Sequence, residues 1–172
     1  MSRYFIYAGN AYPHKNLDRL MEAVKAAEVD LYIASSRNVF TKRLEEKKNE
    51  YVKLLGFVPD EKLKELYKNS IAFVFPSFSE GFGLPGIEAM EAGTLVLCSD
   101  IPVFREIYKD AAIYFNPYDL SSIEKVMKNA LFLTAEERKS KIAYAQKFVA
   151  RYSWQKMAKE TLKVYEGGGK VS

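Results

Sequence analysis

The stretch that decides the fold is IAFVFPSFSEGFGLPGIEAMEAGTLVLC, residues 71–98. It begins and ends with short apolar runs that are typical of buried strands, and residues 84–92 between them have a helical pattern. Pro85 suits the first turn of that helix, and Gly93 suits the position just past its end. The stretch therefore predicts a strand–helix–strand unit with a glycine-rich loop before its helix.

The same alternation of short apolar and longer amphipathic runs extends to both sides of this unit. Strands are predicted over 3–9, 30–34, 51–56, 71–75, 94–99 and 111–115, and helices over 16–27, 39–48, 60–69 and 84–92. After Pro117 the sequence has helical patterns almost to its end. Near-continuous apolar strands that alternate with helices predict an α/β fold. We expect a Rossmann-like, doubly wound parallel sheet of about six strands with extra C-terminal helices.

Length and composition indicate one soluble domain. The chain has 172 residues, of which 48% are hydrophobic and 28% charged, as in ordinary globular proteins. We expect this domain over residues 1–166, with a flexible tail over 167–172. No apolar run is long enough to cross a membrane, and the N-terminus does not resemble a secretory signal. Cys98 is the only cysteine, which excludes an internal disulfide and favours a cytoplasmic location.

The charge distribution bears on partners. The net charge is +4, and ten Lys and Arg residues outnumber five Glu residues over 120–166. This bias suits an anionic substrate, or peripheral contact with the inner face of a membrane. Nucleic-acid binding would require a more concentrated basic stripe, so we do not expect it.

The loop before the helix contains G-x-G-x-x-G, formed by Gly81, Gly83 and Gly86. This pattern is found in NAD-binding folds, and Asp100 lies where a ribose-binding acid would be expected. Three details count against NAD: five residues separate the strand from the first glycine, the helix is short, and the unit is the fourth in the chain. What remains is a predicted anion site, because glycines let backbone N–H groups approach a phosphate at a helix N-terminus.

Two acids, Glu80 and Glu88, flank this anion site with seven residues between them. Carboxylates aimed at a phosphate would repel it, so we expect both to accept hydrogen bonds from hydroxyl groups on either side. A sugar nucleotide offers that arrangement of hexose, diphosphate and ribose. The alternatives are a helix cap with a surface residue, or a glycoside hydrolase with its carboxyl groups about 5–9.5 Å apart. The hydrolase leaves the phosphate-type loop and Lys15 unexplained.

Several longer motifs resemble one family. PSFSEGFGLPGIEAMEAGTLVLCSDIPVFREI (76–107) resembles the E-x7-E segment of the retaining GT-B glycosyltransferases of group 1, family 4. YAGNAYPHKNLDRLMEA (7–23) resembles the first strand and phosphate loop of that family's donor domain, and LLGFVPDEKLKELYKNS (54–70) its nucleobase side. RYSW (151–154) resembles the start of its terminal helix. The resemblance covers nearly the whole chain and corresponds to the C-terminal, donor-binding half of such an enzyme.

The resemblance implies a role for individual residues. Glu80 matches the catalytic position that contacts hydroxyls of the donor sugar, Glu88 the acid that holds the ribose, and Lys15 the lysine that contacts the diphosphate. Transfer in the family runs on one face of the sugar, the leaving diphosphate helps to deprotonate the acceptor, and no metal or other cofactor is required. The other residues implied at the donor site are Asn10, Gly56, Phe57, Val58, Gly81, Phe82, Gly83 and Leu84.

Some positions depart from the family pattern. Asn10 stands where an arginine is usual, as in the GN…PHKN subset in which mannosyl transfer from a GDP donor is common. Residues 34–36 (ASS) replace a glycine-rich turn, and His14, the only histidine, is expected to shape its loop and not to catalyse. The implied partners are a nucleotide sugar and an N-terminal acceptor domain of the same enzyme. A stand-alone nucleotide-binding module without catalysis is the alternative.

Overall fold

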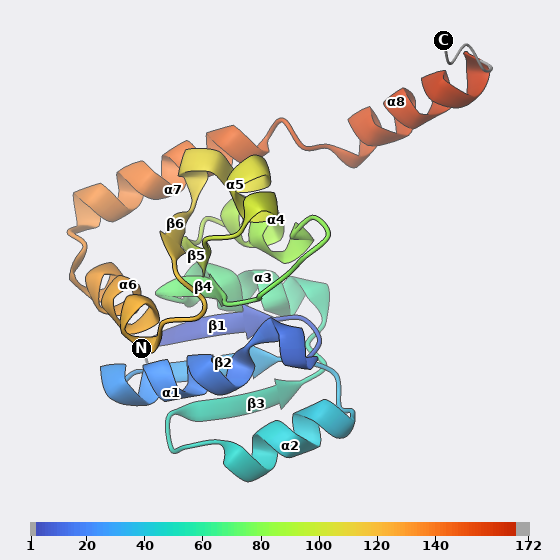
Figure 1. Ribbon diagram of the computed structural model, residues 1–172. Helices are drawn as coiled ribbons and strands as arrows, with labels where there is room; N and C mark the ends of the chain where they lie inside the picture. Colours follow the sequence, from blue (N-terminus) through green and yellow to red (C-terminus); the bar gives the residue numbers. More distant parts are fainter. Residues whose placement is uncertain (1–2, 168–172) are drawn as a thin grey trace.

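The sheet is the centre of the molecule (Figure 1). The structure, a computed structural model, describes residues 3–167, so the predicted tail beyond Gly167 lies outside the described residues. All strand pairs are parallel, and the strand order is β3-β2-β1-β4-β5-β6. The strands are β1 (Tyr4–Ala8), β2 (Asp30–Ala34), β3 (Val52–Gly56), β4 (Ala72–Phe75), β5 (Val96–Ser99) and β6 (Ile113–Phe115). The predicted α/β, Rossmann-like class is confirmed.

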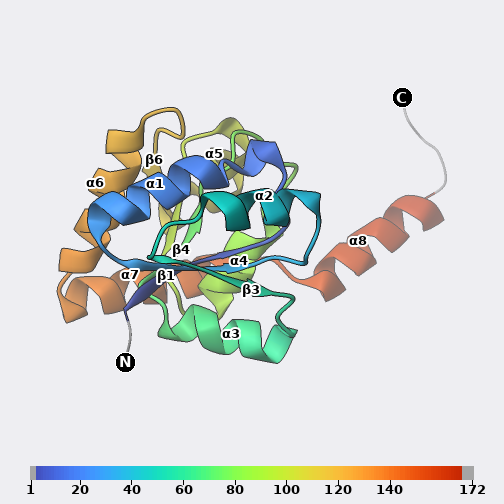
Figure 2. The same ribbon diagram turned by 90° about the horizontal axis from the view of Figure 1, so that it is seen from below.

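Helices cover both faces of the sheet (Figure 2). On one face, α1 (Leu17–Ala27) packs between α2 (Val39–Lys47) and α6 (Leu120–Phe132). On the other face, α4 (Leu84–Glu91) packs between α3 (Asp60–Asn69) and α7 (Ala135–Val149). This two-sided cover explains why β1 and β4 are buried at every residue and read as continuous apolar runs.

The order in which strands are added to the sheet reverses at its middle, between β1 and β4. From β1 the chain proceeds outward to β2 and β3 and then returns to form β4 on the other side of β1. Phe5 and Ile6 of β1 pair with Ala72 and Phe73 of β4. In open α/β sheets, ligands bind beyond the carboxyl ends of the strands at such a reversal point. The fold therefore directs attention to the loops that follow β1 and β4.

Three short elements and the last helix complete the fold. The turns η1 (Pro13–Lys15) and η2 (Lys109–Ala111) are 3-10 helices, and α5 (Pro102–Tyr108) is a seven-residue helix that the sequence pattern did not predict. Helix α8 (Trp154–Glu166) extends away from the body in both views (Figures 1 and 2). Within residues 3–167, no helix combines the length and apolar character that crossing a membrane requires.

Candidate functional site

A buried ion pair lies beyond the carboxyl ends of β1 and β4, at the point where the strand order reverses. Lys15 follows β1 and Glu80 follows β4, and the Lys15 Nζ atom is 2.5 Å from the Glu80 Oε1 atom. The two side chains are only 10% and 11% exposed. Residues 65 positions apart in the chain are thus brought into contact at the carboxyl edge of the central strands. The structure places these two predicted site residues together.

Asn16 fixes the turn that presents Lys15. Its backbone has a φ of 56°, which asparagine adopts more readily than most residues. Its buried side-chain amide donates to the carbonyls of Pro76, at 3.1 Å, and Pro117, at 3.0 Å. The turn is thereby tied to the loops after β4 and β6. Sequence reasoning missed this residue, although an asparagine between a strand-end loop and the following helix was a usable signal.

Tyr7 supports the loop from below. This fully buried residue of β1 donates its hydroxyl to the Asn10 carbonyl at 2.6 Å. Burial, followed by the nearby Glu80 charge, raises the pKa of Tyr7 well above its ordinary value. Because the phenol stays protonated, it remains a donor that holds the Asn10 backbone in place. The Asn10 side chain is itself exposed and accepts a long hydrogen bond from the Tyr12 N–H, 3.4 Å away.

Two glycines of the G-x-G-x-x-G pattern are explained by packing against Tyr108 and do not require a bound dinucleotide. Gly83 has a φ of +96°, and a Cβ atom on either Gly83 or Gly86 would overlap the Tyr108 hydroxyl of α5. Tyr108 also donates that hydroxyl to the Gly83 carbonyl. Gly81, in contrast, has nothing within 4 Å of where its Cβ would lie. Two of the three glycines therefore make room for one buried tyrosine, and Gly81 leaves the approach to the loop open.

The start of α4 presents an uncapped helix end beside this loop. Gly83 is the N-cap residue and offers no side chain, Pro85 has no N–H, and the first turn holds no acid. The N–H of Gly86, which a side-chain cap would usually bind, bonds the Gly83 carbonyl at 3.1 Å instead, and the positive end of the helix favours an anion. The side chains of Phe82 and Leu84 are exposed.

Glu88 lies in a groove between α3 and α4, whereas Glu80 pairs with Lys15. Glu88 lines this groove of about 500 Å³ together with Asp60, Tyr67 and Glu91. Burial raises the pKa of the Glu88 carboxyl group, and the charges of Asp60 and Glu91 raise it further. The buried Tyr67 hydroxyl has no hydrogen-bond partner among the described residues. Carboxylates and an unpartnered hydroxyl suit a ligand rich in hydroxyl groups.

The residues after β3 form the third part of the carboxyl edge. Gly56 ends the strand with a φ of +72°, and Val58 is half-buried. Phe57 is 75% exposed, so its side chain lies outside the core. Within residues 3–167, no hydrogen bond or ion pair joins these residues to Lys15 or Glu88. They share the carboxyl edge of the sheet with Lys15 because parallel strands all end on the same side.

Three other positions that the sequence analysis discussed, Asp100, His14 and the segment 34–36, lie outside the Lys15–Glu80 pair and the Glu88 groove. The Asp100 carboxylate accepts two hydrogen bonds from Arg105, at 2.6 and 2.7 Å, which lower its pKa and occupy it. His14 is exposed, and its carbonyl accepts from the Phe78 N–H at 2.8 Å. Ser35 is buried after β2 with its hydroxyl unpartnered among residues 3–167.

Solved structures define the class of fold. The chain superposes on a glycosyltransferase from Rickettsia africae ESF-5 with a TM-score of 0.86 and 20% identity, covering 99% of this chain and 49% of that one. It superposes on a sucrose-phosphate synthase from Thermosynechococcus elongatus with a TM-score of 0.85 and 19% identity, covering 96% of this chain and 45% of that one. The fold is that of the GT-B glycosyltransferases.

Sequence comparison identifies the family. The sequence model of "Glycosyl transferases group 1" matches residues 1–148, and the chain therefore belongs to this family. It is 35% identical to the O-antigen chain mannosyltransferase RfbU of Salmonella typhimurium over 161 residues, which are 90% of this chain and 44% of that protein. It is 31% identical to the O-antigen chain mannosyltransferase B of Escherichia coli, over 95% of this chain and 45% of that protein. The chain thus spans less than half the length of these relatives.

Proposed function

We propose that the chain is the donor-binding domain of a retaining glycosyltransferase that moves a hexose, mannose or a similar sugar, from a nucleoside-diphosphate sugar to a glycan or lipid-linked acceptor. The observation that carries the proposal is the buried Lys15–Glu80 pair beside the uncapped start of α4. It offers a cation, backbone N–H groups and a carboxylate within one edge of the sheet. Relatives named as mannosyltransferases support mannose, and with it a GDP donor.

The donor groups are assigned to neighbouring parts of the edge. The diphosphate binds Lys15 and the backbone N–H groups of Gly83 and Leu84. Once the phosphate neutralises Lys15, the Glu80 carboxylate is released from its ion pair and accepts hydrogen bonds from the sugar hydroxyls. Glu88, in the hydroxyl-friendly groove between α3 and α4, holds the ribose. The backbone of Gly56, Phe57 and Val58 lies along the base, with Asn10, Gly81 and Phe82 completing the site.

The chemistry follows from charge that develops during transfer. The bond between the anomeric carbon and the β-phosphate oxygen breaks, and negative charge grows on the departing diphosphate. Lys15 and the N–H groups at the start of α4 are fixed in place before the reaction, so they stabilise this charge without reorganisation. The departing phosphate oxygen takes the proton of the acceptor hydroxyl, which attacks from the same face and retains the anomeric configuration. We propose no metal and no other cofactor for this step.

The acceptor is assigned to a further part of the enzyme. Because the chain spans less than half of its relatives, we propose that a separate N-terminal domain supplies the main acceptor site and closes over the donor. We propose a cytoplasmic enzyme, and the basic excess over 120–166 supports peripheral contact with an anionic membrane.

Calorimetric titration of the 172-residue chain with GDP, UDP and ADP tests the donor assignment. We expect one nucleotide to bind best, and Glu88→Ala to weaken it by about 1.5–3 kcal/mol, the range for a hydrogen bond to a charged group. Glu80→Ala should spare the free nucleotide and weaken only its sugar conjugate. Glu106→Ala, an exposed carboxylate on α5, is the matched control. Failure of all three nucleotides to bind, or equal losses for both ligands in Glu80→Ala, would contradict the assignment.

A further inference from the structure

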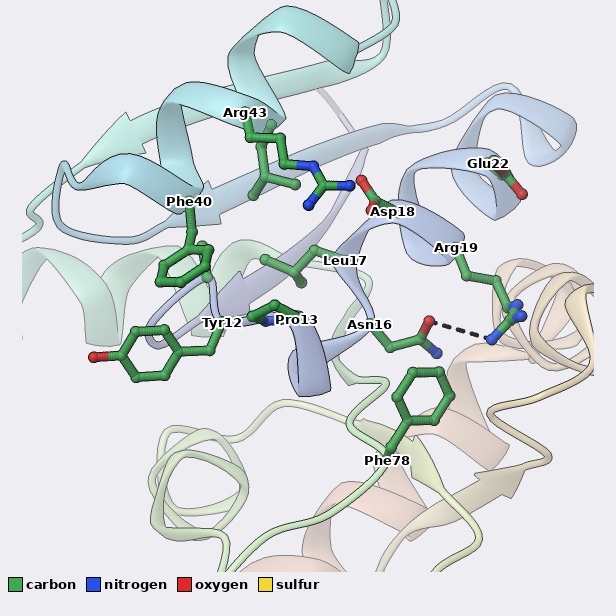
Figure 3. Close-up of a pocket in the computed structure, with 12 residues that line it drawn as sticks. Tyr12, Pro13, Asn16, Leu17, Asp18, Arg19, Glu22, Phe40, Arg43 and Phe78 are labelled. Atoms are coloured by element: carbon green, nitrogen blue, oxygen red, sulfur yellow. Dashed lines mark hydrogen bonds between the residues drawn. The ribbon is translucent and has the colours of Figure 1, made fainter.

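A second groove crosses the N-terminal turn of α1 (Figure 3). It lies on the face of the sheet that α1 and α2 cover, opposite the face of α3 and α4, between which the Glu88 groove lies (Figure 2). Its volume is about 330 Å³, at the small end of the range of roughly 300–1,000 Å³ for ligand pockets. Its walls come from η1, the first turns of α1 and α2, and the loop after β4. None of its lining residues belongs to the proposed donor site.

Aromatic rings lie at both ends of this groove. Tyr12 and Phe40 form one end, with ring centroids 5.2 Å apart and an interplanar angle of 88°. Phe78 forms the other end, where its ring stacks on Tyr118 with centroids 4.9 Å apart and also lies 5.7 Å from the Arg19 guanidinium carbon, so Tyr12 is the more accessible ring. Figure 3 shows Pro13 and Leu17 between the two ends. Tyr12 is 45% exposed, so a large apolar ring surface is in contact with water and open to a ligand.

The polar lining of the groove is balanced in charge. Asp18 and Glu22 provide carboxylates, and Arg19 and Arg43 provide guanidinium groups. Asp18 already pairs with Lys47 at 3.2 Å and Arg19 donates to the Pro117 carbonyl at 2.8 Å, so Glu22 and Arg43 are the more available pair. Within residues 3–167, Glu22 and Arg43 have no ion-pair partner, and both are exposed. Balanced charge gives no preference for a phosphate, which separates this groove from the Lys15 site. Carboxylates accept and guanidinium groups donate hydrogen bonds, so the set is suited to a neutral ligand with several hydroxyls.

A pyranose ring has this combination of surfaces. Its faces carry C–H groups that pack on aromatic rings, and its rim carries hydroxyl groups that both donate and accept. We propose that the groove binds a hexopyranose residue of the glycan acceptor. This inference rests on the proposed glycosyl transfer, because it makes the groove a subsite of that reaction.

The position of the groove fits an acceptor next to the donor. Pro13 lines the groove, and Lys15, two residues further along the same turn, faces Glu80. The loop after β4 is joined to this turn by the hydrogen bond from the Phe78 N–H to the His14 carbonyl. One turn thus separates the two sites. A glycan anchored by one residue in the groove extends its neighbouring residue toward the sugar that is to be transferred.

Titration of the isotope-labelled 172-residue chain with a manno-trisaccharide, and separately with GDP, tests this inference by NMR. The trisaccharide should shift the amides of Tyr12, Phe40 and Arg43, whereas GDP should shift those of Lys15, Gly83 and Glu88. Tyr12→Leu keeps an apolar side chain but removes the ring, and should weaken trisaccharide binding about tenfold, equivalent to about 1.4 kcal/mol. Arg43→Gln should weaken it in the same direction. Both variants should bind GDP as the parent does.

Tyr144→Leu is the matched control, because Tyr144 is a 50% exposed tyrosine on α7, outside the groove. It should leave both affinities unchanged. The inference is overturned if the trisaccharide shifts no amide of the groove, if it shifts only donor-site amides, or if Tyr12→Leu and Arg43→Gln bind it like the parent. Equal loss in Tyr144→Leu would also overturn it. GDP binding decides the donor assignment independently, so failure of the groove and failure of the proposed function are distinguishable.

Discussion

Removal of one member of the Lys15–Glu80 pair should destabilise the fold strongly. Lys15→Met preserves the length of the side chain and leaves the Glu80 carboxylate without its cation at 11% exposure. Breaking a buried ion pair in this way costs about 3–5 kcal/mol. Because Glu80 lies near the surface and water can partly replace Lys15, we expect the lower end, about 3 kcal/mol. For a domain of this size the melting temperature should fall by about 6–12 °C.

Equilibrium unfolding in urea, followed by circular dichroism at pH 7, measures this loss. The double variant Lys15→Met/Glu80→Leu removes both charges and should be about 2 kcal/mol more stable than Lys15→Met. The single variant Glu80→Leu completes the double-mutant cycle, from which the coupling energy of the pair is obtained. Lys62→Met is the matched control, because Lys62 pairs with Glu65 on the exposed face of α3, where such a pair contributes about 0–1 kcal/mol. A loss below about 1 kcal/mol in Lys15→Met, or additive effects in the double variant, would refute the reasoning.

Three further outcomes can be checked by the same unfolding assay. Gly83→Ala should lose about 2–4 kcal/mol, because it forces a side chain into a positive φ and against the α5 tyrosine, whereas Gly81→Ala, in open space, should be near neutral. Asn16→Ala should lose about 1–3 kcal/mol because a buried carbonyl loses its donor; an unchanged midpoint, as expected for the exposed Asn129→Ala, would contradict this. The fold raises the pKa of the Glu88 carboxyl group above its ordinary value of 4.5. Protonated Glu88 therefore contributes stability below pH 4.5, and this contribution is lost as the pH rises through the raised pKa. Glu88→Gln should therefore gain stability over the parent at pH 7 relative to pH 4, and a difference independent of pH would show the sign to be wrong.

The architecture could be predicted because its signals are local. Strands such as β1 and β4 are short apolar runs, and helices such as α1 and α3 are amphipathic, so the alternation was visible without long-range information. Pro85 and Gly93 marked the two ends of α4, as the structure confirms. The same alternation predicts a doubly wound parallel sheet but not the order of its strands. That order depends on packing between segments that are distant in the sequence.

What sequence reasoning missed depends on tertiary contacts. Helix α5 has seven residues and no side-chain cap, so its local signal is weak, and its main role is to bury Tyr108 against two glycines of the α4 loop. The literal G-x-G-x-x-G was therefore a packing requirement that looked like a cofactor motif. Asn16 was missed because its partners are carbonyls more than 60 residues along the chain. Lys15 and Glu80 were both predicted as site residues, but the ion pair between them was not.

The pairing of β1 with β4 has a consequence for the order of folding. Strands β1, β2 and β3 are joined by single crossovers, whereas β1 and β4 meet only after the segment that contains all of these crossovers has closed into a loop. Such non-local pairings form slowly, because loop entropy is lost before contacts compensate for it. Lys15 follows β1 and Glu80 follows β4, so the two residues come together only when these strands pair. A nascent or partly folded chain can therefore hold most of its secondary structure and still have no anion site, which makes nucleotide binding a reporter of completed folding.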